Sequence, residues 1–252
     1  LQILGGRVIA NDDQALGVDR TLANSLTMNN GTLAAGGANR SFSTPVTLDT
    51  NTTNTLAGAT YDLELSGVVS GSGVLHKDEA ATAILSGENT YTGATDVEAG
   101  ALQIGNGGAT GTIGLGAVTV SNGASIVFNR TGTLDYKASA RMRDVSGEGD
   151  IELDGGVTVF NYTGSGGGFS EANSWNNFSG TLRVLGGSEF KTIRNGATAM
   201  GTGTIELGDG ATSGHLSQTE GNWAWTNPID LVGSANEIHN RSGGAGGPRR
   251  RQ

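Results

Sequence analysis

Residues 83–104 of the chain read Ala-Ile-Leu-Ser-Gly-Glu-Asn-Thr-Tyr-Thr-Gly-Ala-Thr-Asp-Val-Glu-Ala-Gly-Ala-Leu-Gln-Ile. Short runs that alternate apolar and polar residues stand between Gly87, Gly93 and Gly100. Such alternation places every second side chain on one face of a strand, where it can enter a core. Glycine supplies the backbone conformations that tight corners need. This stretch therefore predicts short β-strands that are joined by glycine corners.

Short alternating runs that end in glycine return along the chain. The run Leu1–Gly6 returns in similar form at Leu102–Gly107 and again at Leu182–Gly187. Two further short motifs follow each copy in the same order, with a spacing of roughly 80–100 residues. Strands that return in fixed order are typical of a solenoid, in which each coil stacks on its neighbour.

Composition narrows the fold class. The chain has 252 residues, of which 44 are glycine and none is cysteine, and only 15% are charged. This excludes a highly charged disordered chain, a coiled coil and a disulfide-stapled domain. Asn-Gly pairs between strands would also suit a meander or sandwich. A sandwich of this length needs more large residues than the 5% aromatic content supplies, so we predict an all-β solenoid, a parallel β-helix.

Charge and hydropathy limit the partners. The net charge of −9 argues against nucleic acid, because an acidic chain repels phosphate backbones. No apolar run is long enough for a membrane-spanning helix, so we predict no membrane insertion. Arg249–Arg251 follow a Gly-rich run and indicate a flexible tail or a processing scar, or alternatively a patch for membranes or polyanions. No signal peptide opens the chain, and Leu1–Ile3 already read as a strand, so we expect a piece of a longer protein.

Residues 67–77 and 83–104 together resemble the passenger-associated transport repeat, also called the autotransporter-associated β-strand repeat. They match its Gly-x-Gly strand with a lysine, its Leu-Ser-Gly and Asn-Thr-Tyr-Thr-Gly motifs, and the two strands that follow. Residues 145–151 and 177–184 are partial echoes, whereas Asp78–Ala81 replace the usual glycine-rich turn. The resemblance implies a right-handed parallel β-helix in a large secreted or surface-displayed bacterial protein. It also implies a stalk or folding scaffold, often of an adhesin, with no fixed enzymatic activity.

These patterns predict a domain organisation and a core. We expect a solenoid over residues 1–242 with roughly 11 coils of about 22 residues each, an insertion near 163–176, and a flexible Gly/Arg tail at 243–252. The predicted structural corners are Gly87, Gly93, Gly100 and Gly123. The predicted inward-facing residues are Leu85, Val97, Leu102, Ile104, Val118 and Val120.

Three carboxylates are candidates for enzymatic chemistry. Asp150, Glu152 and Asp154 alternate along one strand, at a spacing near that of glycosidase carboxylates. They would suit a β-helix polysaccharide-active enzyme. The same pattern describes a solvated strand face whose partners Ile151 and Leu153 point inward. We follow the second interpretation and predict no catalytic residues and no enzyme.

Metal ligands are not indicated by spacing. Residues 147–150 and 208–210 faintly resemble glycine-rich calcium loops, but the tandem copies that such loops require are missing. We therefore predict no cofactor, with a structural calcium ion as the alternative. His76, His215 and His239 lie far apart in the sequence and lack metal-ligand spacing, which indicates surface or turn roles.

Aromatic residues gather late in the chain. Trp223 and Trp225 share one strand face, and Tyr162 and Trp175 precede them. Flat rings of this kind can stack on sugars, so these four are possible ligand contacts. Alternatively they cover the end of the solenoid or pack an insertion against its side.

The sequence predicts an extracellular or cell-surface, non-enzymatic structural segment of a bacterial stalk, fibre or autotransporter-like adhesin. Its expected partners are other copies or neighbouring segments stacked end to end, because an uncapped solenoid end leaves backbone groups open. Two alternatives stay open: an adhesin module that binds cell-surface glycans or a host protein, and a polysaccharide-active enzyme.

Overall fold

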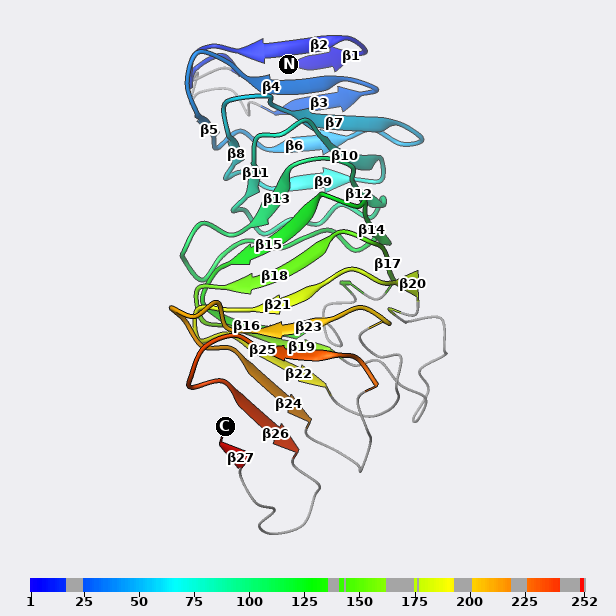
Figure 1. Ribbon diagram of the computed structural model, residues 1–252. Coiled ribbons are helices and arrows are strands. Elements are labelled where there is room, and N and C mark those ends of the chain that lie inside the picture. The colour runs from blue at the N-terminus through cyan, green and yellow to red at the C-terminus, as the bar shows by residue number, and fades with distance from the viewer. Residues whose placement is uncertain are drawn as a thin grey trace.

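The computed structural model describes residues 1–16, 25–135, 141–142, 144–161, 175, 177–192, 201–218, 226–240 and 250–251. Over these residues the chain is an all-β parallel solenoid, whose coils stack from the N-terminus to the C-terminus (Figure 1). No helix in this part of the chain has the length and apolar character that crossing a membrane would need.

The strands form four sheets, here named A to D. Sheet A contains β1 (Gln2–Leu4), β3 (Leu26–Asn29), β6 (Val46–Leu48) and β9 (Val69–Gly71). Sheet B contains β2 (Arg7–Ala10), β4 (Thr32–Ala35), β7 (Thr53–Ala57), β10 (Val74–Asp78), β12 (Thr95–Val97), β14 (Val118–Val120), β17 (Val145–Gly147) and β20 (Asn177–Phe178).

Sheet C contains β5 (Arg40–Phe42), β8 (Leu63–Leu65), β11 (Ala83–Leu85), β13 (Ala101–Ile104), β15 (Ser125–Asn129), β18 (Asp150–Asp154), β21 (Leu182–Val184), β23 (Ile205–Leu207) and β25 (Ile229–Leu231). Sheet D contains β16 (Gly132–Asp135), β19 (Val157–Asn161), β22 (Glu189–Thr192), β24 (His215–Gln218), β26 (Glu237–Asn240) and β27 (Arg250–Arg251). Within the described residues only β27 pairs antiparallel, with β26.

Each strand pairs with its equivalent one coil later, which makes the sheets parallel. Coil length varies, because Ala83 pairs with Leu102 across a short coil, whereas Ile151 pairs with Leu182 across a much longer one. The longest sheet holds nine strands, which corresponds to about eight turns. The predicted solenoid is therefore confirmed, but the predicted count of coils is not, because several coils are longer than the uniform length assumed for them. The right-handed sense stays a prediction.

The core is a set of stacked inward columns. All six residues predicted to face inward are at most 1% exposed: Leu85, Val97, Leu102, Ile104, Val118 and Val120. Strand β13 shows the pattern in its simplest form, with Leu102 and Ile104 buried and Ala101 and Gln103 partly exposed. Burial of one such side chain contributes about 1.5–3 kcal/mol, so the alternation read from the sequence is the main source of stability.

The four predicted corner glycines meet two different requirements. Gly100 and Gly123 have φ angles of 65° and 81°, in the left-handed region that side chains disfavour. Gly87 and Gly93 lie directly against the coil before them. A Cβ atom at Gly93 would overlap the carbonyl oxygen of Gly73, so at this position the requirement is space.

The predicted domain boundaries stay predictions. The insertion expected at 163–176 lies outside the described residues, apart from Trp175. In the expected tail at 243–252, Arg250–Arg251 form β27 beside β26, and the rest of that segment is not described.

Candidate functional site

A lysine occupies an inward position of the solenoid. Lys77 on β10 lies in the column that continues through Leu56 on β7 and Val97 on β12. Its side chain is fully buried, like the leucine and valine on either side. The four-carbon stem therefore takes the place of an aliphatic core residue, while the ammonium group must find partners inside the protein.

The ammonium group of Lys77 is fully hydrogen-bonded. Its Nζ atom donates to the carbonyl oxygens of Asp78, Glu79 and Ala99 over 2.9, 2.7 and 2.9 Å. An ammonium has three donors, so all of them are used. Burial lowers the pKa of Lys77 to about 8, against the attraction of Asp78 and Glu79. The lysine joins the corner after β10 to the corner one coil later.

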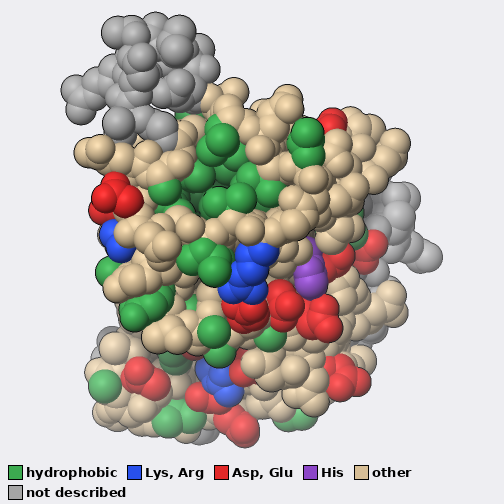
Figure 2. Space-filling model, turned by 90° about the horizontal axis from the view of Figure 1, so that it is seen from above, with side chains coloured by type: hydrophobic (Ala, Val, Ile, Leu, Met, Phe, Trp, Pro, Cys, Tyr) green, Lys and Arg blue, Asp and Glu red, His purple; other side chains and the backbone are tan. Residues whose placement is uncertain are grey.

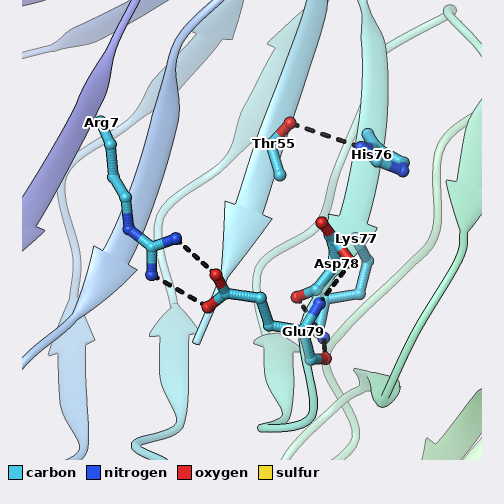
Figure 3. Close-up of polar contacts among 6 residues, drawn as sticks. All are labelled: Arg7, Thr55, His76, Lys77, Asp78 and Glu79. Atoms are coloured by element: carbon cyan, nitrogen blue, oxygen red, sulfur yellow. Dashed lines mark hydrogen bonds and ion pairs between the residues drawn. The ribbon is translucent and has the colours of Figure 1, made fainter. Parts of the chain in front are cut away.

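The corner after β10 is also held from outside (Figure 3). Arg7 reaches from β2 to the Glu79 carboxylate, with Nη1–Oε1 and Nη2–Oε2 distances of 2.5 and 2.9 Å. This paired hydrogen bond lowers the pKa of Glu79. Glu79 has a φ angle of 66°, so a non-glycine residue takes the left-handed conformation where the repeat usually has glycine. Lys77 bonds to the backbone of this residue from inside the solenoid, and the exposed Arg7 pair adds a contact at the surface.

Asn89 of the Asn-Thr-Tyr-Thr-Gly motif connects three coils. Its Oδ1 accepts the amide hydrogen of Val69 at 2.8 Å, and its Nδ2 donates to the carbonyl oxygen of Thr112 at 2.6 Å. Sheet A ends at β9, and residues 89–93 form no strand. Backbone amides of residues 90–92 still donate to carbonyl oxygens of β9, and the Asn89 side chain accepts from the Val69 amide, which a further strand would otherwise have paired.

Tyr91 of the same motif fills the core beneath this corner. It is fully buried, and its hydroxyl group lies 2.8 Å from Oγ1 of Thr95. Burial raises its pKa to about 12. Gly114 of the next coil lies so close to the ring that a Cβ atom there would overlap ring atoms. The motif is thus a packing device, and neither Asn89 nor Tyr91 faces solvent as a binding group would.

A half-buried polar cavity of about 340 Å³ lies on sheet D, near the C-terminal end. Its walls include His215 on β24, Glu237 and His239 on β26, and Glu189 and Lys191 on β22. The Oε2 atom of Glu237 lies 2.6 Å from Nε2 of His239 and 3.5 Å from Nδ1 of His215. One ligand atom from each of these three side chains lies within 4.8 Å of the others.

The grouping of His215 and His239 was not predicted, because the sequence analysis assigned all three histidines to surface or turn roles. The structure places these two beside Glu237 and leaves His76 outside the group. Parallel stacking pairs His215 with Glu237 of the following coil, and His239 follows on the same face of that strand. The signal available in the sequence was that His215 and Glu237 are separated by the length of one coil. A search for ligands at short spacings could not find it, because stacked neighbours are a full coil apart in sequence.

The four possible ligand contacts among the aromatic residues divide into two groups. Trp223, Trp225 and Tyr162 lie outside the described residues. Trp175 is 1% exposed, packs edge-on against Phe178, and donates from Nε1 to the carbonyl oxygen of Met142 at 2.9 Å. Its ring lies in the core, as the alternative interpretation of a packed cluster expects.

The carboxylates of β18 form part of an outer charged face. Asp150, Glu152 and Asp154 are partly exposed, and the residues between them are buried. Arg183 on β21 lies next to this face, with Nη1 2.5 Å from Oδ2 of Asp150 and Nε 3.4 Å from Oε2 of Glu206. Burial, followed by the charge of Asp154, raises the pKa of Glu152. The arginine links carboxylates of the strands on either side of it, as expected for a surface ion-pair network.

Comparison with known proteins identifies one repeat in the chain. The family model of the passenger-associated-transport-repeat matches residues 75–104, the segment that contains Lys77, Asn89 and Tyr91. The chain therefore contains this repeat within a parallel β-solenoid, and part of it is similar to an autotransporter adhesin. No solved structure matches the chain.

One curated relative is the Adhesin BmaC autotransporter of Brucella suis biovar 1 (strain 1330). It is 41% identical to this chain over 83 residues, which is 33% of the chain and 2% of the relative. The chain thus corresponds to a very small part of that protein's length.

Proposed function

We propose that the chain is a structural, non-enzymatic segment of a secreted or surface-displayed bacterial stalk, fibre or adhesin passenger. The observation that carries the proposal is the uninterrupted stacking of parallel coils, with sheet C running through nine strands. Each coil is bonded along its length to the next, which gives a stiff rod. The match to the transport repeat and the similarity to an autotransporter adhesin support an extracellular location.

The repeat itself strengthens the contacts between coils. Lys77 and Asn89 each bond to a neighbouring coil with buried side-chain atoms. Such bonds resist sliding and separation of coils better than exposed ion pairs, which are worth little in water. A segment built in this way holds other parts of a protein at a fixed distance.

The first coil offers a surface for further stacking. Leu1, Leu4 and Ile9 are 63%, 71% and 53% exposed at the N-terminal end. Figure 2, which looks onto this end, shows hydrophobic side chains gathered there. β1 and β2 are the edge strands of their sheets, with backbone groups open on one side. We propose that this end stacks against another solenoid coil, from a neighbouring segment or another copy.

Light scattering after size-exclusion chromatography tests stacking between copies. We expect the wild-type chain to associate as its concentration rises, and a Leu4→Lys/Ile9→Lys variant to stay monomeric because charges block the edge. Leu115→Lys is the control, since Leu115 is 37% exposed but lies away from the first coil. A wild-type chain that stays monomeric up to millimolar concentration would rule out stacking between copies.

Immunogold electron microscopy tests the location and the structural role. Antibodies against this chain should label intact cells of the source bacterium along surface projections. Label confined to the cell interior would refute the proposal. Label at the outermost tip alone would favour the second candidate, a glycan-binding or host-binding module, which the similarity to an adhesin supports. A glycan array with the wild-type chain and Trp223→Ala then tests that module.

A further inference from the structure

The cavity on sheet D carries an ordered grid of polar side chains. In register, Glu189, His215 and Glu237 form one column over three stacked strands. Lys191, Ser217 and His239 form the parallel column on the same face of those strands. Stacking thus repeats one pair of outward positions and gathers nitrogen and oxygen donors at a single place. The structural role proposed above does not require such a grouping.

Three members of the grid have the composition of a transition-metal site. Two imidazole nitrogens and one carboxylate oxygen, from His215, His239 and Glu237, are already within 4.8 Å of one another. Zinc holds such ligands at about 2.0–2.2 Å, which places ligand atoms about 3.4 Å apart in a tetrahedral site. Rotation of these half-buried side chains can bring the donor atoms together around an ion. Imidazole ligands favour zinc and its neighbours over calcium or magnesium.

The charges around the cavity also favour a cation. Glu189 and Glu237 are acidic, and among the described lining residues Lys191 on β22 is the cation. Arg251 on β27 pairs in backbone register with Glu237. The ammonium of Lys191 lies 3.2 Å from Oε2 of Glu189, which offsets its charge. Ser217 donates to the other oxygen of Glu189 at 2.5 Å. Glu189 is thereby engaged with the lysine, and Glu237 supplies the carboxylate nearest the two histidines.

We propose that His215, Glu237 and His239 bind one divalent transition-metal ion of the zinc class. The ion links β24 to β26 and joins two successive coils near the C-terminal end of the solenoid. Three protein ligands leave a fourth tetrahedral position for water or another donor. This proposal goes beyond the structural role and does not depend on it.

Isothermal titration of the untagged chain with zinc chloride tests the site. We expect one zinc ion per chain with a micromolar dissociation constant. His215→Ala and His239→Ala should each weaken binding at least tenfold, because each removes one of three ligands. Cobalt bound to the wild-type chain should show the visible absorption of a tetrahedral site. Calcium at the same concentration should not displace zinc, because it prefers oxygen ligands.

His76→Ala is the matched control. His76 is also paired with a glutamate, with Nε2 3.0 Å from Oε2 of Glu98, but among the described residues it belongs to no three-ligand group. Zinc binding by this variant should equal that of the wild type, and circular dichroism should show that all variants remain folded. The proposal is overturned if the folded wild type shows no zinc binding in the micromolar range, or if folded His215→Ala and His239→Ala bind as tightly as the wild type.

Discussion

Lys77 shows how a charged side chain can occupy the core of a narrow solenoid. Its stem lies between aliphatic neighbours, and its three donors reach carbonyl oxygens of two corners. A buried charge without partners would be very costly, whereas a fully hydrogen-bonded one is tolerated. The remaining cost appears as a pKa lowered to about 8, with burial as its main cause.

The lowered pKa predicts that the contribution of Lys77 to stability grows in alkali. Between about pH 8 and the ordinary value of 10.5, the unfolded chain holds the proton of Lys77 and the folded chain does not. Unfolding then takes up a proton, so the free energy of unfolding rises with pH. Below pH 8 both states are protonated, and this dependence disappears.

Urea unfolding of the wild type and Lys77→Met at pH 7.5 and pH 10 measures the effect. The difference in unfolding free energy, wild type minus variant, should increase by about 2 kcal/mol at the higher pH. Taking the difference removes the contribution of other titrating groups. An equal difference at the two pH values would contradict the lowered pKa.

The corner at residues 89–93, one coil beyond the last strand of sheet A, depends on the side chain of Asn89. One coil after β9, residues 89–93 form a corner without a strand, and Asn89 bonds to the coils on both sides. The Asn-Thr-Tyr-Thr-Gly motif therefore keeps backbone bonds to the coil before it and adds side-chain bonds to the coils on both sides. This explains on physical grounds why the motif combines an amide, a buried ring and a glycine.

Asn89→Ala should lower the unfolding free energy by about 2–4 kcal/mol. The change leaves the Val69 amide and the Thr112 carbonyl oxygen buried without a partner, and each such group costs about 1–3 kcal/mol. Thr92→Ala is the control within the same motif, because Thr92 is exposed, and it should change stability by less than about 0.5 kcal/mol. Chemical denaturation followed by circular dichroism measures both. Similar losses for the two variants would refute the bridging role.

Gly93→Ala should destabilise the chain by about 2 kcal/mol or more, because a Cβ atom would overlap the Gly73 carbonyl oxygen of the preceding coil. Gly108→Ala is matched to it, since a Cβ atom at Gly108 meets nothing within 4 Å. That change should stay within about 0.5 kcal/mol. Thermal melting compares the two. Equal melting temperatures would mean that coils do not approach closely at this corner.

At the scale of the whole molecule, contacts join each coil to its neighbours and to few others. Sheets B and C run through most of the described coils, whereas sheet A serves the N-terminal part and sheet D the C-terminal part (Figure 1). The middle coils are held from both sides, and the first coil from one side only. Stability should therefore decline from the centre towards the ends.

Hydrogen–deuterium exchange can follow this gradient. Amides of β11 and β13 should exchange at least tenfold more slowly than those of β1 and β2, at a concentration where the chain is monomeric. The reason is that the edge strands open without disrupting a second interface. Uniform protection along the chain would show that the solenoid unfolds as a single cooperative unit.

The sequence alone determined the strand pattern, the solenoid class, the inward residues and the relation to the transport repeat. These are local or periodic properties: alternation assigns a face to each side chain, and the repeated order of motifs indicates stacking. Leu102 and Ile104 could be placed in the core without knowing which coil lies next to them.

The tertiary structure decided what depends on register between coils. The number of turns follows from coils of unequal length, and their lengths are set by corners that the sequence pattern does not delimit. The role of Lys77 depends on a carbonyl group one coil away, and the cavity on sheet D depends on His215 facing Glu237. Parallel stacking brings together residues a full coil apart, and only the folded register shows which residues those are.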